Sequence, residues 1–149
     1  MSHINIEIKA RTNDQDEIRK LLKSLNADFK GVDLQIDTYF NVNSGRLKLR
    51  EGKIENYLIH YNRKNVEEPK QSDVILFKTE PDSSLKEILQ NALVVLVVVD
   101  KKREIYFIDN VKFHIDEVTE LGTFIEIEAI DIDGKIAKEK LLEQCNFYR

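Results

Sequence analysis

Charged side chains alternate with apolar ones along several short segments of the chain. In residues 3–11, Glu7, Lys9 and Arg11 alternate with isoleucine and alanine, and Glu126 and Glu128 flank Ile127 in the same way. This period of two predicts strands whose charged side chains share one face. Carboxylates placed together can hold a hard divalent cation, and Lys and Arg side chains can bind phosphate. For any one strand alone, the pattern is more typical of a solvated outer face.

The middle of the chain adds a strand of cations. Residues 46–50 read Arg-Leu-Lys-Leu-Arg, which predicts three positive side chains on one strand face. Like charges on one face repel, so this face needs a counter-charge. None of the three histidines has the spacing of a metal motif. His114 shares a predicted strand face with Lys112 and Asp116, which places it close to any site on that face.

Composition limits the class of protein. The chain has 149 residues, of which 42% are hydrophobic and 34% charged, as expected for one globular domain with a buried core. Its formal net charge of −4 argues against a general nucleic-acid binder, which normally has a basic excess. The single cysteine, Cys145, excludes an intramolecular disulfide and fits a reducing compartment.

The most apolar segment is the run 92–99, Ala-Leu-Val-Val-Leu-Val-Val-Val. It is too short for a membrane span, which needs about 20 residues, and its β-branched content predicts a strand buried on both faces. The amino terminus is polar and begins a strand pattern at once. We therefore expect a cytoplasmic protein without contact to a membrane.

Hydrophobic periodicity and turn residues mark nine candidate strand segments, which we count as about eight strands, and three helices. The expected strands are 3–11, 32–40, 46–50, 57–63, 73–79, 94–99, 103–108, 111–118 and 123–129. The expected helices are 12–25, 81–91 and 133–144. Short connections imply antiparallel neighbours. The alternation itself does not distinguish an open sheet with one wet face from a closed barrel with a charged interior.

Several of these segments resemble the signature motifs of the CYTH superfamily, also called triphosphate tunnel metalloenzymes. Asp116-Glu-Val-x-x-Leu-Gly-x-Phe124-x-Glu126-x-Glu128 matches the family pattern Asp-x-Val-x-x-Leu-Gly-x-Phe-x-Glu-x-Glu without a gap. Asn5-x-Glu7-x-Lys9 is similar to the family's Glu-x-Glu-x-Lys, with Asn5 in place of the first Glu. The other similar elements are Gln35-x-Asp37-x-Tyr39-Phe40, Leu47-Lys48-Leu49-Arg50, Tyr61-Asn62-Arg63 and Lys101-x-Arg103.

These matches span residues 3–130 in the family's order, and the most similar subgroup is that of small archaeal and bacterial proteins named class IV adenylyl cyclases. The resemblance implies an α+β fold, with an eight-stranded antiparallel β-barrel that forms a tunnel and is flanked by helices. It implies one domain over residues 1–149. Family members usually continue beyond the position of Arg149, so the last helix is expected to be cut short.

The resemblance also implies roles for the inward charges. The expected phosphate-binding residues are Lys9, Arg11, Lys48, Arg50, Arg63, Lys101 and Arg103. Mg²⁺ or Mn²⁺ is expected on Glu7, Glu126 and Glu128, with Asp116 binding the ion directly or through another ligand. Glu7 and Lys9 are the expected catalytic residues. Because Asn5 brings no charge, a second metal site next to Glu7 is expected to be weakened.

The function implied is metal-dependent phosphoryl transfer on a triphosphate held in the tunnel. A class IV-type adenylyl cyclase, which converts ATP to cyclic AMP and pyrophosphate, is the first hypothesis. An inorganic, thiamine or nucleoside triphosphatase is the second, and a non-catalytic nucleotide- or polyphosphate-binding module is the third. The expected partner is a small-molecule triphosphate and not a nucleic acid, and a homodimer is left open.

Overall fold

The chain forms eight strands and two helices in the computed structural model, which describes residues 2–63 and 70–131, and the side chains of residues 5–62 and 73–130. The strands are β1 (Ser2–Arg11), β2 (Asp28–Phe40), β3 (Arg46–Glu51), β4 (Tyr57–Arg63), β5 (Lys70–Lys78), β6 (Val95–Ile108), β7 (Val111–Val118) and β8 (Gly122–Asp131). The helices are α1 (Gln15–Ser24) and α2 (Leu85–Ala92). The helix expected at 133–144 lies outside the described residues.

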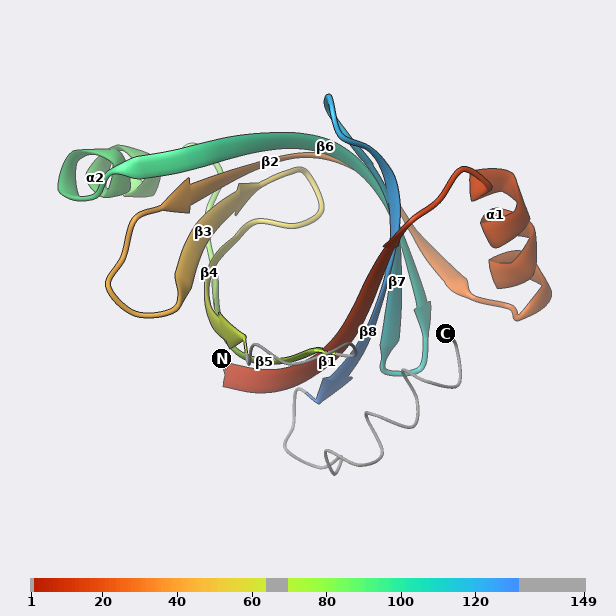
Figure 1. Cartoon of the computed structure of the whole chain (residues 1–149). Coiled ribbons are helices and arrows are strands. Elements are labelled where there is room, and N and C mark those ends of the chain that lie inside the picture. Colours follow the sequence, from red (N-terminus) through yellow and green to blue (C-terminus); the bar gives the residue numbers. More distant parts are fainter. Residues whose placement is uncertain (1, 64–69, 132–149) are drawn as a thin grey trace.

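All strand pairs are antiparallel, and β1 closes the sheet because it pairs with β5 on one side and β8 on the other. The order around the ring is β1-β5-β4-β3-β2-β6-β7-β8 (Figure 1). The expected α+β barrel with flanking helices is therefore confirmed. Neither helix of the described part has the length and apolar character needed to cross a bilayer.

The apolar face of the alternating strands points outward where α1 covers it. Ile6 and Ile8 of β1 pack with Phe113 and Ile127 of the neighbouring strands, and Leu22 of α1 closes this core. Leu22 is buried because the helical period brings one apolar stripe of α1 onto the barrel. Since the alternate residues of the same strands must then point inward, the charged side chains enter the barrel interior.

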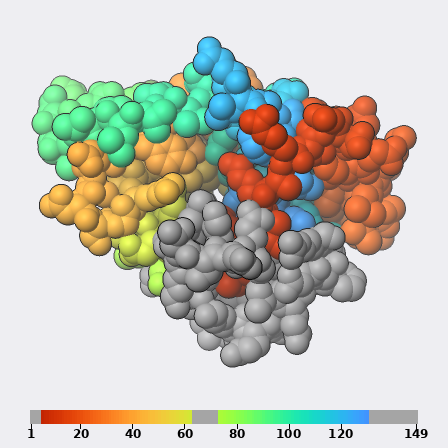
Figure 2. Space-filling model, in the orientation of Figure 1, coloured from red at the N-terminus to blue at the C-terminus, as the bar shows by residue number. Residues whose placement is uncertain are grey.

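The outer wall also carries a polar contact between α1 and β6. Arg19 donates from Nε to Glu104 Oε1 at 2.9 Å, and the same guanidinium forms an ion pair with Glu104 Oε2 at 2.5 Å. Figure 2 shows α1 on one side of the molecule and α2 with the first part of β6 on the other. The two helices thus flank the barrel on different sides.

The strands expected at 94–99 and 103–108 are a single strand, and the prediction that the apolar run is buried on both faces is wrong. Leu96, Val97 and Val98 are 63%, 50% and 54% exposed. The reason is the pairing: β6 pairs with β2 along this part, but its pairing with β7 begins only at Lys101. The β-branched run therefore forms a strand that extends beyond β7.

Candidate functional site

The barrel encloses a cavity of about 260 Å³ to which all eight strands contribute side chains. Among the described residues that line it are six cations and four carboxylates. These are Lys9, Lys48, Arg50, Lys101, Arg103 and Lys112, and Glu7, Glu55, Glu126 and Glu128. The charged strand faces therefore turn inward, and the closed barrel, not the open sheet, is the arrangement that this sequence adopts.

Two arginines are each fixed by an aspartate on the neighbouring strand. Arg50 donates from Nε and Nη2 to the two carboxylate oxygens of Asp37, both at 2.9 Å. Arg103 binds Asp116 in the same two-point manner, also at 2.9 Å. In both cases the strand register places the partners directly opposite each other. Each guanidinium is thus oriented by one edge, which leaves its Nη1 nitrogen for another anion.

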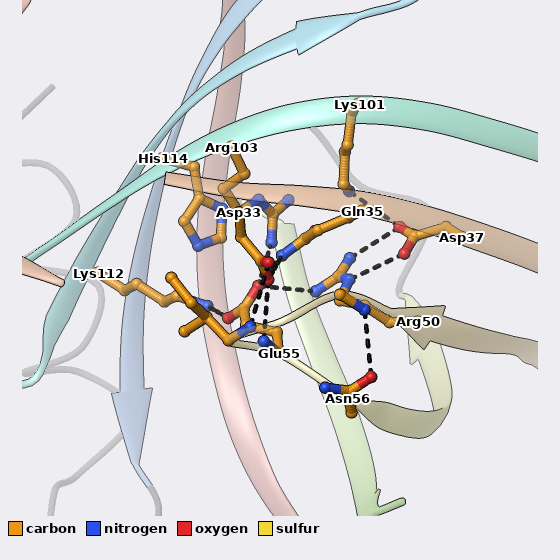
Figure 3. Close-up of polar contacts among 12 residues, drawn as sticks. Asp33, Gln35, Asp37, Arg50, Glu55, Asn56, Lys101, Arg103, Lys112 and His114 are labelled. Atoms are coloured by element: carbon orange, nitrogen blue, oxygen red, sulfur yellow. Dashed lines mark hydrogen bonds and ion pairs between the residues drawn. The ribbon is translucent and has the colours of Figure 1, made fainter. Parts of the chain in front are cut away.

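That anion is the carboxylate of Glu55, which lies between the two arginines (Figure 3). Its Oε1 atom is 3.2 Å from Arg103 Nη1 and 3.7 Å from Arg50 Nη1. Its Oε2 atom forms an ion pair with Lys112. Burial opposes the charge of Glu55, but Lys112, Arg103 and Arg50 hold its pKa well below the usual range. Glu55 therefore occupies, as an anion, the place where the two Nη1 groups converge.

Glu55 reaches the interior because the loop between β3 and β4 folds onto Asp33. The fully buried Asp33 carboxylate accepts the backbone N–H groups of Lys53, Ile54 and Glu55 at 2.7, 3.1 and 2.9 Å. Gly52 precedes them, and a Cβ at that position would collide with the same carboxylate. Sequence reasoning missed Glu55, since it lies in a turn and has no strand alternation to signal its direction.

Two lysines on the same strands as these arginines, Lys101 of β6 and Lys48 of β3, differ in their partners. Lys101 forms an ion pair with Asp37 at 2.9 Å, and burial together with Arg50 and Arg103 lowers the pKa of Lys101 to about 8. Lys48 lies over the rings of Tyr39 and Tyr61, with Nζ 5.5 and 5.2 Å from their centroids. Burial and Arg50 lower the pKa of Lys48 well below its usual value. Within the described residues Lys48 forms no ion pair, so an anion entering the cavity would supply its counter-charge.

Carboxylates gather on the opposite part of the wall, where β1 pairs with β8. Glu7 lies directly across from Glu128, and Lys9 lies across from Glu126. Burial and, to a lesser extent, the negative charge of nearby Glu126 raise the pKa of Glu128 to about 7. Facing carboxylates in a buried site repel, and a divalent cation between them would remove that repulsion. The donor set therefore fits a bound divalent ion.

His114 of β7 extends this carboxylate cluster. The side chain is 1% exposed, and neither ring nitrogen has a hydrogen-bond partner in the described structure. Its Nδ1 atom is 3.8 Å from Glu126 Oε2, and one donor atom each from His114, Glu126 and Glu128 lies within 4.8 Å of the others. Burial and the neighbouring Arg103 and Lys112 lower the pKa of His114 to about 3, so its imidazole is neutral.

The other predicted site residues take distinct places. Asn5 lines the cavity, and its Oδ1 atom is buried without a hydrogen-bond partner in the described part of the chain. Lys9 is exposed and also lines the cavity, with Nζ 5.0 Å from the Phe124 ring centroid. Arg11 is exposed and lies over the same ring at 5.3 Å. The side chain of Arg63 lies outside the described residues.

The motif places Asp116 near the ion, but both of its carboxylate oxygens accept hydrogen bonds from Arg103. Burial opposes its ionisation, and the Arg103 guanidinium nonetheless holds the pKa of Asp116 below its usual value. This geometry is that of a residue that orients an arginine. Of the two roles expected for Asp116, direct binding of the ion and action through another ligand, this geometry favours the second.

An apolar wall completes the cavity on β4 and β5. It consists of Tyr57, Ile59, Tyr61, Val74 and Leu76. Ile59, Tyr61 and Val74 form a buried cluster of their own, separate from the core under α1. The lumen is therefore not uniformly charged, and it offers a surface against which an organic group could pack.

Comparison with known proteins gives consistent matches over almost the whole chain. Residues 3–147 match the family model described as the CYTH domain. A protein of Methanocaldococcus jannaschii named "Putative adenylate cyclase" is 27% identical over 150 residues, which cover 95% of this chain and 85% of that protein. A solved structure of a Pyrococcus horikoshii protein superposes with a TM-score of 0.71 at 25% identity, over 95% of this chain and 88% of that one.

A structure from Vibrio parahaemolyticus described as a "putative adenylate cyclase" has a TM-score of 0.70 at 16% identity. It covers 98% of this chain and 88% of that one. At this identity the likeness concerns the fold alone.

Proposed function

Since this chain belongs to the CYTH family, we propose that it is a metal-dependent phosphoryl-transfer enzyme whose substrate is a triphosphate bound inside the barrel. One observation carries the proposal: Arg50 and Arg103, each held by an aspartate, point their Nη1 groups at a common anion position inside the cavity. Across the lumen stand the carboxylates of β1 and β8. A polyanion and its counter-cation need this combination of groups.

Binding of the phosphates is assigned to the four cations of β3 and β6. Arg50 and Arg103 offer guanidinium N–H groups whose direction is already fixed, so little ordering is needed when a phosphate arrives. Lys48 and Lys101 add compact charges beside them. Asp37 and Asp116 act indirectly, by holding the arginines in place.

The divalent cation is assigned to Glu7, Glu126 and Glu128, and Glu7 and Lys9 are assigned the contacts to the reacting phosphate. When bound, the cation supplies neutralisation of phosphate charge, the principal requirement of phosphoryl transfer. The residues of this chain orient the substrate around it. Lys9, exposed at the edge of the cavity, supplies a positive charge on the same strand face as Glu7.

The first candidate reaction is that of a class IV-type adenylyl cyclase. The ribose 3′-oxygen of ATP would attack the α-phosphorus, the bond to pyrophosphate would break, and the hydroxyl proton would be released, which gives cyclic AMP and pyrophosphate. The apolar wall on β4 and β5 favours this reading, since an organic group of the substrate can pack there. The name of the Methanocaldococcus jannaschii relative agrees with it.

A triphosphatase, in which water attacks the terminal phosphorus, is the second candidate. The observation in its favour is the cavity volume of about 260 Å³. Pockets that enclose an organic ligand usually measure about 300–1,000 Å³. A short inorganic or organic triphosphate would fill the smaller space with fewer rearrangements of Glu55 and its loop.

Product analysis distinguishes the candidates. The full chain is incubated with ATP, and separately with tripolyphosphate, in Mn²⁺ or Mg²⁺. Cyclic AMP with pyrophosphate identifies a cyclase, release of phosphate identifies a triphosphatase, and tight binding without products identifies a binding module. Glu126→Gln and Glu128→Gln should each abolish turnover, whereas Glu117→Gln, an exposed glutamate of β7, should leave it unchanged. Undiminished turnover in both lumen variants would contradict the metal assignment.

A further inference from the structure

We propose that His114 is a metal ligand, and that His114, Glu126 and Glu128 form a mixed nitrogen and oxygen site that prefers a transition-metal ion over Mg²⁺. The inference rests on the proposed metal-dependent function but goes beyond it. It adds a residue that the sequence motifs do not include and it names the class of ion. Glu126 and Glu128 line the cavity. His114 of β7 is buried in the wall beside them, near Lys112 and Arg103 (Figure 3).

The strand register brings the three donors together. His114 lies directly across from Glu126 in the β7–β8 pair, and Glu128 follows two residues later on the same face of β8. The imidazole Nδ1 atom is 3.8 Å from Glu126 Oε2, which is too long for a hydrogen bond. Two ligands that share one ion at bond lengths of about 2.0–2.2 Å lie up to about 4.4 Å apart. The observed separation suits an ion between them.

The ring nitrogens of His114 supply a second, independent reason. Both are buried, and neither has a hydrogen-bond partner among the described residues. Buried polar atoms in native proteins are almost always satisfied by protein, water or an ion. A histidine that merely filled space would be expected to donate one ring N–H to a neighbouring oxygen. A bound ion would use one nitrogen of His114 and would also relieve the repulsion between Glu126 and Glu128.

The nearby cations do not prevent a metal from binding there. Arg103 is paired with Asp116 and Glu55, and Lys112 is paired with Glu55. Their charges are therefore offset within the lumen. The carboxylates of Glu126 and Glu128 supply negative charge for an incoming ion, and the imidazole of His114 supplies a third donor atom.

The mixture of donors determines the choice of ion. Mg²⁺ prefers oxygen ligands and an octahedral shell with several waters. Imidazole nitrogen binds Co²⁺ and Zn²⁺ best, Mn²⁺ less well and Mg²⁺ least. Three protein ligands leave positions open for water or for a phosphate oxygen, as in catalytic metal sites. The site is thus suited to a divalent transition ion that also contacts the substrate.

Pulsed electron paramagnetic resonance on Mn²⁺ tests the proposal without substrate or turnover. The full chain is loaded with less than one equivalent of Mn²⁺ at neutral pH, with natural-abundance histidine and with ¹⁵N-labelled histidine. We expect a nitrogen coupling on Mn²⁺ whose frequency changes with the isotope. The coupling should disappear in His114→Gln and persist in His60→Gln, a control in which the substituted ring contacts the Ser44 carbonyl instead.

Affinity measurements give a second readout on the same proteins. His114→Gln should weaken Co²⁺ or Mn²⁺ binding by about ten- to a hundred-fold, the range seen when groups around a metal site are removed. It should change Mg²⁺ affinity much less, so the ratio between the ions should fall. If His114→Gln does not fold, the isotope comparison on the variant His3→Gln/His60→Gln, which keeps His114 as the only histidine, decides the question.

The outcomes separate this inference from the proposed function. Mn²⁺ bound in the lumen without nitrogen coupling would overturn the role of His114 and leave a carboxylate metal site standing. Nitrogen coupling in a protein that turns over no triphosphate would support the site and contradict the proposed enzyme. Retention of coupling in His114→Gln would overturn the proposal as well.

Discussion

Asp37 and Asp116 have the same task for two arginines of the lumen. Each accepts two hydrogen bonds of 2.9 Å from a guanidinium on the strand beside it. Asp37 is fully buried and also binds Lys101. Although burial opposes ionisation, Arg50 and Lys101 hold the pKa of Asp37 well below its usual range. The Asp37–Arg50 ion pair therefore makes stability sensitive to acid, in addition to orienting the arginine.

Replacing Asp37 by Asn should destabilise the protein by about 3–5 kcal/mol at neutral pH, because Arg50 would lose its buried partner. The unfolded chain takes up the Asp37 proton near pH 3.9 and the folded protein does not, so this stabilisation is present above that pH and is lost as pH falls below it. Denaturant unfolding at a series of pH values gives the difference in free energy of unfolding between wild type and variant. This difference should be constant above about pH 5 and should shrink below about pH 4. Asp100→Asn, at an exposed site of β6, serves as the control. A gap independent of pH would contradict the assignment.

Asn5 is the residue at which the opening motif departs from the family pattern. It faces the cavity, 9% exposed, two residues before Glu7 on the same strand face. Asn5→Glu should restore the charge of a second metal position and lower the metal concentration needed for half-maximal turnover. Without metal the variant should melt at a lower temperature, since another carboxylate then joins Glu7 in a buried site. Identical metal dependence and melting in wild type and variant would show that Asn5 does not contribute to a metal site.

Among the loops and strands around the lumen, the loop from Gly52 to Asn56 has the largest effect on its charge. Its backbone is tied to Asp33, and its Glu55 carboxylate neutralises Arg103, Lys112 and, more distantly, Arg50. A phosphate group that binds the same cations must share them with Glu55 or displace it. The loop therefore sets how much positive charge an incoming anion meets.

Glu55→Gln should consequently raise the affinity for tripolyphosphate by about ten-fold or more, since a charge-assisted contact contributes about 1.5–3 kcal/mol. The same change should lower the melting temperature of the ligand-free protein, because three buried cations lose a counter-charge. Calorimetric titration measures the first effect and a thermal scan the second. Glu104→Gln, which removes a carboxylate from the outer wall, should leave the affinity unchanged. Weaker binding by Glu55→Gln would mean that Glu55 helps to position the cations for phosphate.

Helix α1 packs on the outside of the barrel, so we expect it to contribute to stability and not to the chemistry of the lumen. Leu22 is 2% exposed and packs on the outer face of β1, β7 and β8, whereas its neighbour Leu21 is 57% exposed. Leu22→Ala should cost about 2–5 kcal/mol in the free energy of unfolding, and Leu21→Ala, the matched control, much less. Metal affinity at 25 °C should not differ between the two. A large change in metal affinity for Leu22→Ala alone would show that the outer core also shapes the lumen.

Local patterns predicted the elements well and the interior only in part. Alternation correctly gave the inward face of residues such as Asp37 and Glu126, because one face of each strand is set by a period of two. The same rule could not find Glu55, whose direction depends on a contact with Asp33 some twenty residues earlier. It also could not assign His114, since the nearness of His114 to Glu126 follows from the register of β7 with β8.

At the scale of the molecule, the decisive event is closure of the sheet by β1. Open-sheet and barrel arrangements have the same alternation, and the difference lies in whether β1 pairs with both β5 and β8. Among the described residues, closure brings six cations and four carboxylates into one cavity, in a chain whose net charge is −4. Their positions, and not the overall charge, make the protein suited to a polyanion. We therefore expect the lumen to bind a triphosphate together with a divalent cation.

Calorimetric titration with tripolyphosphate, pyrophosphate and phosphate in the presence of Mn²⁺ measures this binding. Lys48→Met is the best probe, because Lys48 forms no ion pair within the described residues and its loss leaves no carboxylate unpaired. Lys102→Met, on the exposed face of β6, is its control. We expect affinity to fall steadily from triphosphate to phosphate, and Lys48→Met to weaken triphosphate binding by about ten-fold or more. Equal affinity for all three anions, or equal binding by Lys48→Met and wild type, would contradict a triphosphate site inside the barrel.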